Sequence, residues 1–292
     1  MKKAVTATAI ALSLIFIFSG CVLSGKITEF TSYLNGNTYT TASGTVSVSD
    51  ISSIDIYWVY GSVKIEESDT DKVTFSEVSS LDGKKDSLGE ATENKELGES
   101  LKMRYKTDGG KLMIQFCKSG LRVRAGAIKD LKKDLTIYVP KGAKYDEIKA
   151  DVVSSDVYMA YLHTDKIVLN SVSADMKLVS CETDRIKCDT VSGKLTVSTD
   201  DTVNEIDMDA VSGDLKVTAR SVSKIEMDSV SANAELTLQK FDFTLKLTGV
   251  SSSLDADGIS FEKTGEKNYK FGDGTGDVKF ESVSGKVRLE EK

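Results

Sequence analysis

Acidic side chains recur in this 292-residue chain at a spacing that could bring them together. A carboxylate or amide stands two residues before successive copies of a Val-Ser phrase, at Asp151, Asn170, Asp189, Asp209 and Asp228. Carboxylate oxygens are the ligands that Ca²⁺ prefers, so stacking would make Asp189, Asp209 and Asp228 a candidate calcium ladder. The alternative is a solvated outer face on which lysines such as Lys187 offset the repulsion between like charges. A melting temperature that does not depend on calcium would exclude the ladder.

The sequence offers few candidate residues for nucleophilic catalysis. The serine of the Val-Ser phrase recurs in every copy, which indicates a ladder that bonds to corner backbone groups, because a catalytic site is singular. His163 is the only histidine, no nucleophile motif accompanies it, and no pair of histidines has metal-ligand spacing. We therefore predict a protein that is not an enzyme. An enzyme that acts on polysaccharide through carboxylates remains a minor alternative.

Aromatic side chains gather near position 58. Tyr57, Trp58 and Tyr60 surround Val59 and are expected to lie on the surface of the first structural repeat. Aromatic rings of this kind can stack on sugar faces or anchor a protein partner. They are the candidate ligand-binding residues.

Repeats of 19–20 residues must position all these side chains. The phrase Val-Ser followed by a small residue begins at Val153, Val172, Val191, Val211, Val230 and Val250, and a further copy begins at Val283 after a gap of 33 residues. Self-similarity at a fixed period is the signature of stacked repeats. The third position of the phrase holds Gly, Ala or Ser, which predicts a bend that demands small size without requiring positive φ.

Each repeat predicts two strands joined at a corner. Apolar residues stand five and three positions before the valine and four and six positions after it, with polar residues between them. This period of two is typical of strands. One repeat buries four or five apolar side chains, worth roughly 6–15 kcal/mol, whereas ordering its backbone costs roughly 20–40 kcal/mol. Only stacked repeats are stable, so we predict an all-β fold: a parallel β-solenoid with 19–20-residue coils.

The predicted organisation has five parts. Residues 1–20 form a signal peptide, 21–50 a tether, 51–66 a first solenoid coil, 67–147 an insertion, and 148–292 the main solenoid. The insertion contains a charged, mobile loop from Ser76 to Ser100 and a β-hairpin that turns at Asp108-Gly109-Gly110. The final coil is expected to cap the stack, with Glu290-Glu291-Lys292 blunting its end.

The N-terminus has the features of a secretory signal. Two lysines precede an apolar run from Ala4 to Phe18, and Ser19-Gly20 leads into Cys21. The stretch resembles the lipobox of bacterial lipoproteins, with Phe18 in place of the commoner Leu. That resemblance implies cleavage before Cys21 and diacylglycerol on its thiol. The protein is then expected outside the cytoplasm, anchored to the cell membrane by lipid; an ordinary signal peptide with an incidental cysteine is the alternative.

The net charge limits which molecules the protein can bind, and the positions of two cysteines predict their environment. The formal net charge is −7 and becomes more negative once the lysine-bearing residues 1–20 are removed, which argues against nucleic acid. Cys188 falls in an inward column and is predicted to be a small buried hydrophobe, while Cys181 lies in a return loop. A Cys181–Cys188 disulfide is the less favoured alternative.

A family resemblance rests on the segment before the main repeats and on the repeats themselves. The approach Asp134-Leu-Thr-Ile-Tyr-Val-Pro-Lys-Gly142, the Val-Ser-Gly copies and the lead Gly272-Asp-Gly-Thr-Gly-Asp277 resemble the bacterial putative-adhesin family of β-strand-repeat proteins, a domain of unknown function. The resemblance covers roughly Ile51 to Leu289. It implies a right-handed parallel β-helix, no established catalytic residues and a surface or envelope role.

Two non-catalytic functions follow as hypotheses. The first is a lipid-anchored cell-surface adhesin or scaffold that binds envelope or host polysaccharide, or a surface protein, through the flat face of the solenoid. The second is an envelope-stress or regulatory component that binds another membrane protein. No cofactor is expected apart from the candidate calcium.

Overall fold

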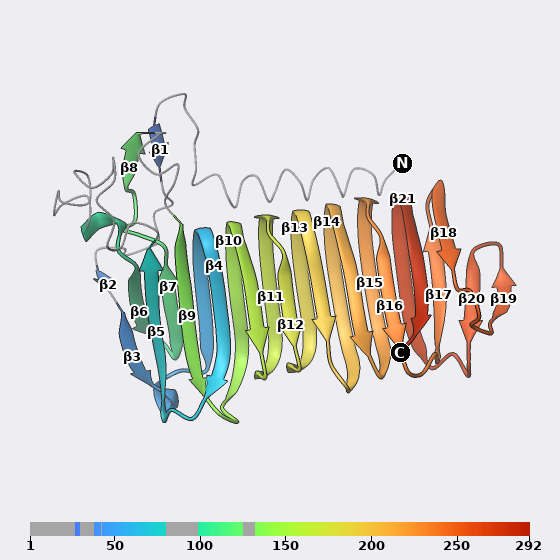
Figure 1. Ribbon diagram of the computed structural model, residues 1–292, viewed down its shortest axis with the longest axis horizontal. Coiled ribbons are helices and arrows are strands. Elements are labelled where there is room, and N and C mark those ends of the chain that lie inside the picture. Colours follow the sequence, from blue (N-terminus) through green and yellow to red (C-terminus); the bar gives the residue numbers. More distant parts are fainter. Residues whose placement is uncertain (1–26, 30–37, 42, 80–98, 125–131) are drawn as a thin grey trace.

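The computed structural model describes residues 27–29, 38–41, 43–79, 99–124 and 132–292, and this part of the chain is built mainly of β-strands (Figure 1). The prediction of an all-β fold is confirmed. In these residues, no helix combines the length and the apolar character needed to cross a membrane. The predicted signal peptide and Cys21 lie outside the described residues.

The main repeats form a row of parallel strands. Their bounds are β10 (Lys144–Ala160), β11 (His163–Ser173), β12 (Met176–Val179), β13 (Glu182–Ser198), β14 (Thr202–Ala219), β15 (Ser221–Ser231) and β16 (Ala234–Leu238). The register brings equivalent residues side by side: Ile148 pairs with Ile167, Ile167 with Ile186, Ile186 with Ile206, and Ile206 with Ile225. The residue columns predicted from the repeat are therefore confirmed.

Alternating burial explains why these segments are strands. In β14 the side chains of Ile206, Met208, Leu215 and Val217 are buried while their neighbours are partly exposed. The inward side chains of successive strands form one continuous apolar cluster. Cys188 is part of it and wholly buried, as predicted, and no disulfide joins it to Cys181.

The corner of the repeat needs more than a small residue. Gly193 has φ +134°, and a Cβ there would overlap the carbonyl oxygen of Ala174 on the neighbouring coil. Gly213 occupies the same column without a positive φ. The expectation that size alone decides is therefore wrong at Gly193, where the backbone adopts a left-handed conformation that favours glycine.

The N-terminal end of the row is closed by strands from the insertion. Strand β4 (Ser53–Ser68) pairs in parallel with β10, with Ile54 beside Ile148, as predicted for the first coil. Its other edge pairs with β7 (Lys111–Gln115) and β9 (Lys133–Pro140). Strand β6 (Arg104–Asp108) forms a hairpin with β7, and β5 (Lys72–Ser79) pairs antiparallel with β9.

Two segments at this end are more ordered than the sequence suggested. Within the predicted tether, β2 (Thr40–Thr41) pairs with β6 and β3 (Gly44–Ser47) pairs with β5, because those strands offer open antiparallel edges. A 3₁₀ turn, η2 (Val48–Asp50), then leads into β4. The predicted loop from Ser76 begins as strand β5 up to Ser79. A separate pair joins β1 (Ile27–Glu29) to β8 (Arg122–Arg124).

The C-terminal end corrects the predicted order of the coils. Strand β21 (Gly276–Glu291) lies between β15 and β16 on one side and β17 (Phe243–Thr248) and β18 (Ser251–Asp255) on the other (Figure 1). The last coil in sequence is therefore internal, and the prediction that it caps the stack is wrong. The hairpin of β19 (Glu262–Gly265) and β20 (Asn268–Phe271) covers the outer edge of β17 instead.

Candidate functional site

The predicted acidic residues do form a column on the outer face. Asp189 pairs in register with Asp209, and Asp209 with Asp228. At the start of the column Asn170 donates a hydrogen bond of 2.6 Å from Nδ2 to Asp151 Oδ1. Stacking therefore places side chains of the same charge on adjacent strands, which are about 4.8 Å apart.

Lysines neutralise some members of this column but not Asp209. Lys149 Nζ lies 2.6 Å from Asp151 Oδ2, and Lys187 Nζ lies 3.1 Å from Asp189 Oδ2. In the next coil the residue aligned with Lys187 is Asp207. Burial, together with the charges of Asp189 and Asp207, consequently raises the pKa of Asp209 to about 6.

The calcium ladder is not supported by this geometry. Within the described ranges, no group of three or more histidine, cysteine, aspartate or glutamate side chains could hold a metal ion. The reason is the arrangement of the stack: Asp189, Asp209 and Asp228 follow one another along a line, whereas calcium needs six to eight oxygens around one point. We correct the calcium hypothesis accordingly.

The aromatic cluster is also not an exposed site. Trp58 is 0% exposed and Tyr57 is 6% exposed, whereas Tyr60 is 36% exposed. Trp58 lies beside Val152 in an inward column, and its Nε1 donates a hydrogen bond of 2.7 Å to the Lys133 carbonyl oxygen. The expectation that Tyr57, Trp58 and Tyr60 form a surface platform is therefore wrong.

Trp58 instead encloses a buried lysine. The ammonium of Lys133 lies 5.1 Å from the Trp58 ring centroid and 4.4 Å from that of Phe116. It also lies 2.5 Å from Glu77 Oε2 and donates a hydrogen bond of 2.7 Å to the Leu101 carbonyl oxygen. Burial lowers the pKa of Lys133, although Glu77 opposes that shift. This cluster joins β4, β5 and β9 to the residue that follows β7, and its role is structural.

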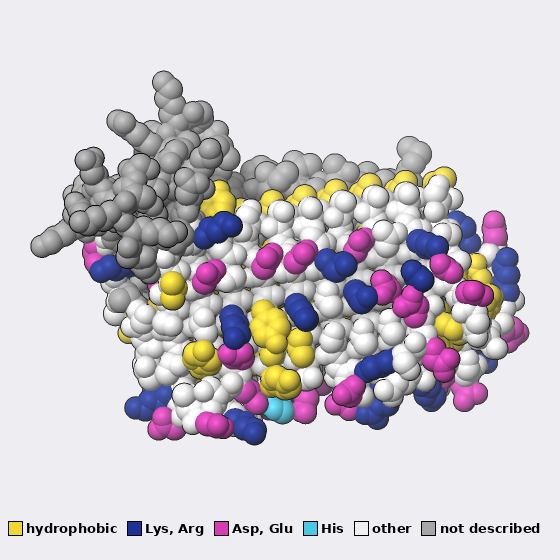
Figure 2. Space-filling view, viewed as in Figure 1, with side chains coloured by type: hydrophobic (Ala, Val, Ile, Leu, Met, Phe, Trp, Pro, Cys, Tyr) yellow, Lys and Arg dark blue, Asp and Glu magenta, His cyan; other side chains and the backbone are white. Residues whose placement is uncertain are grey.

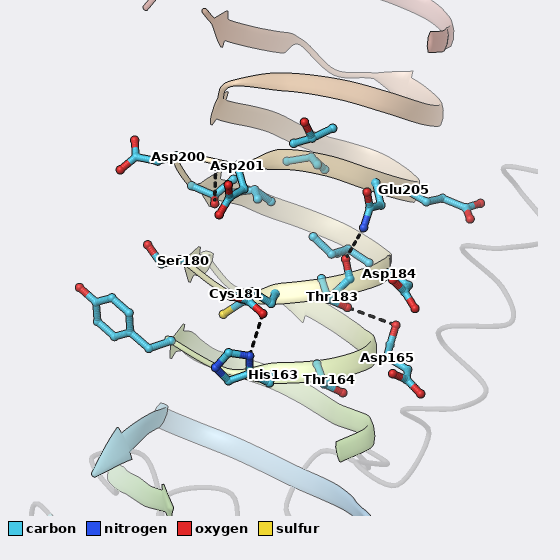
Figure 3. Close-up of a pocket in the computed structure, with 18 of the residues that line it drawn as sticks. His163, Thr164, Asp165, Ser180, Cys181, Thr183, Asp184, Asp200, Asp201 and Glu205 are labelled. Carbon is cyan, nitrogen blue, oxygen red and sulfur yellow. Dashed lines mark hydrogen bonds and ion pairs between the residues drawn. The ribbon is translucent and has the colours of Figure 1, made fainter. Parts of the chain in front are cut away.

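One surface depression lies at the return bends between coils. This return-bend cleft has a volume of about 830 Å³, and polar side chains from successive coils line it (Figure 3). His163 Nδ1 lies 2.9 Å from Glu182 Oε2, and its Nε2 lies 3.5 Å from Glu67 Oε1. Tyr161 and Ser180, which also line the cleft, have positive φ values of 58° and 47°.

The chemistry of the return-bend cleft argues against covalent catalysis there. The Cys181 thiol donates to the carbonyl oxygens of Met159 and Val179, each at 3.6 Å. Burial raises the pKa of Cys181, which disfavours the nucleophilic thiolate. Both ring nitrogens of His163 face carboxylates, those of Glu67 and Glu182 on two different strands. Neither nitrogen faces a hydroxyl or thiol that it could activate as a nucleophile.

Another depression, which we call the tyrosine groove, lies on the outer face of the strands that follow the corners. Its volume is about 550 Å³. Tyr158 pairs in register with Lys64 on β4 and with Lys177 on β12, so a lysine stands on each side of the aromatic residue. On the face of the molecule in view, Figure 2 shows a group of hydrophobic side chains with basic side chains on either side.

Charge in the tyrosine groove is mixed. Lys64 forms an ion pair of 2.8 Å with Glu66, while Lys177 and Lys194 are exposed on the neighbouring coils. Asp156 and Asp175 also line it, and each Asp accepts a backbone hydrogen bond from the next coil. Because these carboxylates already accept backbone hydrogen bonds, the lysine ammonium groups and the Tyr158 ring are the groups best able to contact a ligand.

Sequence analysis missed Tyr158. The available signal was its position: it is an aromatic residue at an outward strand position, with lysines at the equivalent positions of the coils on either side. The coil before it in space is β4, which is 94 residues away in sequence. The triplet becomes visible when the first coil, residues 51–66, is aligned with β10 and β12.

A known protein family matches most of the chain. Residues 51–290 match the model of the family described as Toastrack DUF4097. The stacked all-β chain belongs to this toastrack family, a family of unknown function. No protein with a curated description matches the chain.

Two solved structures are similar at low sequence identity. One is described as a putative cell adhesion protein from Clostridium sporogenes ATCC 15579, with 11% identity and a TM-score of 0.36, over 87% of this chain and 100% of the other. The second is described as a putative adhesin from Bacteroides fragilis NCTC 9343, with 12% identity and a TM-score of 0.33, over 87% of this chain and 97% of the other.

Proposed function

We propose that this chain is a non-catalytic surface protein that lies outside the cytoplasm, is anchored to the membrane by lipid on Cys21, and binds polymers. In this proposal the parallel strands form a right-handed β-solenoid whose outer face is the binding surface. The ligand is an envelope or host polysaccharide that carries negative charges. The signal-like N-terminus supports the location, and the row of parallel strands supports an extended binding face.

The tyrosine groove is the observation that carries the binding proposal. An aromatic ring can stack on the apolar face of a sugar, and lysines on both sides can pair with carboxylate or phosphate groups on the same polymer. The groove also runs across successive coils, so consecutive units of an extended chain meet equivalent positions. Several weak contacts along one polymer then add up through their high effective concentration.

A binding measurement with matched variants tests this function. The protein that begins at Val22 is exposed to an array of cell-wall glycans, host glycans and matrix proteins, with and without calcium. We expect saturable binding to an anionic glycan that is weakened at least tenfold by Tyr158→Ala and unchanged by Tyr60→Ala, which removes a tyrosine outside the groove.

The outcomes separate the alternatives. Binding that survives Tyr158→Ala together with Lys177→Ala refutes the groove as the site. A folded protein that binds nothing on the array favours the second hypothesis, in which the partner is another membrane protein; crosslinking in cells then identifies that partner. Binding that needs calcium would revive the acidic column.

A further inference from the structure

Basic side chains recur on every second coil along the outer face that holds the tyrosine groove. The residue column that contains Tyr158 runs from β4 to β18 along the stack, each member in register with the next (Figure 1). In spatial order its members are Lys64, Tyr158, Lys177, Thr196, Lys216, Glu235, Arg288 and Asp255. None of these side chains is buried. We call this set the alternating column.

The C-terminal half of the alternating column neutralises its own charge. Lys216 forms an ion pair with Glu235 on the next coil. Arg288 then lies in register between two acids, Glu235 on one side and Asp255 on the other. Opposite charges on adjacent strands stabilise a sheet, so the alternation in this half has a structural explanation.

The N-terminal half is different, because its intervening positions carry no charge. Tyr158 and Thr196 stand on the two sides of Lys177. Within the described residues, Lys177 forms no ion pair. Lys64 and Lys216 each have one carboxylate partner, and an ammonium group has three donors, so both retain donors for a ligand. This half therefore presents three lysines, on alternate coils, that can contact a ligand.

Avoidance of like charges does not account for the uncharged positions. Like charges on adjacent strands destabilise a sheet, which would favour alternation in any charged column. The acidic column of the same coils does not alternate, since Asp189, Asp209 and Asp228 stand on three successive strands. The stack thus tolerates adjacent like charges, and a requirement of folding does not explain the regular spacing of the three lysines.

We infer that the tyrosine groove selects an extended polysaccharide in which acidic and neutral sugars alternate, lying along the stack with its acidic groups on the lysines of every second coil. This inference rests on the proposed function and specifies its ligand. The lysines are two coil spacings apart, about 9.6 Å. A sugar unit in an extended chain is about as long as one coil spacing, so acidic groups on every second sugar repeat at the distance between the lysines.

The intervening positions fit the neutral sugars. The ring of Tyr158 can stack on the apolar face of one neutral sugar, and the hydroxyl of Thr196 can exchange hydrogen bonds with the hydroxyls of the next. An acidic group at the coil of Tyr158 would meet no lysine in the column. It would instead lie near Asp156, which is two residues before Tyr158 on β10 and also lines the groove. A polymer with an acid on every sugar is therefore a poorer fit.

Two octasaccharides of different charge spacing test the ligand side of the inference. Hyaluronan carries one carboxylate for every two sugars, and oligogalacturonate carries one on every sugar. Titration calorimetry of the purified full chain should show tighter binding of the hyaluronan octasaccharide, by about fivefold, which corresponds to one favourable exposed ion pair. Non-specific attraction between charges would give the opposite order, because oligogalacturonate has the higher charge.

A variant that moves one charge by one coil tests the protein side. Lys177→Thr combined with Thr196→Lys keeps the composition and the net charge but breaks the alternation. It should weaken hyaluronan binding by about fivefold and remove the preference between the two octasaccharides. Lys194→Ala is the matched control: Lys194 is an exposed lysine that lines the same groove but stands in the neighbouring column, so the preference should remain. Melting temperatures show that each variant is folded.

The outcomes separate this inference from the proposed function. If both octasaccharides bind equally, or oligogalacturonate binds more tightly, the spacing is refuted; the proposed function stands as long as Tyr158→Ala weakens that binding. A preference that survives the moved charge also refutes the spacing. If neither octasaccharide binds, the inference is wrong, and the proposed function fails with it only when the glycan array gives no ligand whose binding depends on Tyr158.

Discussion

Asp209→Asn should make the protein more stable at neutral pH. An aspartate that is free in the unfolded chain has a pKa near 3.8, and the fold raises the pKa of Asp209 to about 6. Each tenfold change in an acid constant is worth about 1.4 kcal/mol, so ionising this side chain in the folded state costs up to about 3 kcal/mol. The carboxylate is partly exposed, and solvent screening reduces that figure to about 1–2 kcal/mol.

The sign of the pH dependence follows from proton binding. Between about pH 4 and pH 6 the folded protein holds a proton at Asp209 that the unfolded chain has lost, so the contribution of this group to stability falls as the pH rises. Above pH 6 the full penalty is present. Asparagine has no such penalty and already occupies the same column at Asn170. The variant should therefore gain stability above pH 6 and gain nothing below pH 4.

Denaturant unfolding at pH 7.5 and at pH 3.5 measures this difference, and the melting temperature at pH 7.5 should rise by a few degrees for a domain of this size. Asp257→Asn removes one exposed acid outside the column and controls for the change in net charge. An equal gain at both pH values would refute the reasoning. So would a loss of stability on substitution that appears only with calcium present, because that would mean the carboxylate binds an ion.

Three further predictions concern other parts of the chain. Gly193→Ala should destabilise the fold by about 2–4 kcal/mol in denaturant unfolding, because it adds both left-handed backbone strain and a clash with the neighbouring coil. The control Gly109→Ala, where φ is +56° but no atom lies near the added methyl group, should lower the free energy of unfolding by about 1 kcal/mol. Lys133→Met should destabilise by about 3–5 kcal/mol because it leaves the largely buried Glu77 carboxylate without its ion-pair partner, and adding Glu77→Gln should recover part of that loss in the same assay. Cys21→Ser should leave an uncleaved precursor without lipid, as seen by mass spectrometry of the membrane fraction; normal processing would contradict the lipid anchor.

The columns of the stack could be predicted because the repeat fixes which residues become neighbours. Ile148, Ile167 and Ile186 occupy equivalent positions 19 residues apart, and parallel pairing in register is the arrangement that buries all of them together. The same alignment places Trp58 beside Val152 in an inward column, so its burial was also available from the sequence. The prediction failed because three clustered aromatic residues were interpreted as a surface feature.

Other features depend on contacts between segments that are distant in sequence. Lys133 belongs to a basic stretch, but it is buried because Glu77, Trp58 and Phe116 converge on it from different segments of the chain. A repeat period describes neighbours that lie one coil apart, and it contains no information on where an insertion folds.

The order of the last two coils shows a further limit. Both β17 and β21 carry the inward pattern of the repeat, Leu245 and Leu247 in one and Val278 and Phe280 in the other, so either could follow β15. The order in the structure makes use of the segment between them. With β21 inside, β20, which belongs to the segment between them, covers the outer edge of β17.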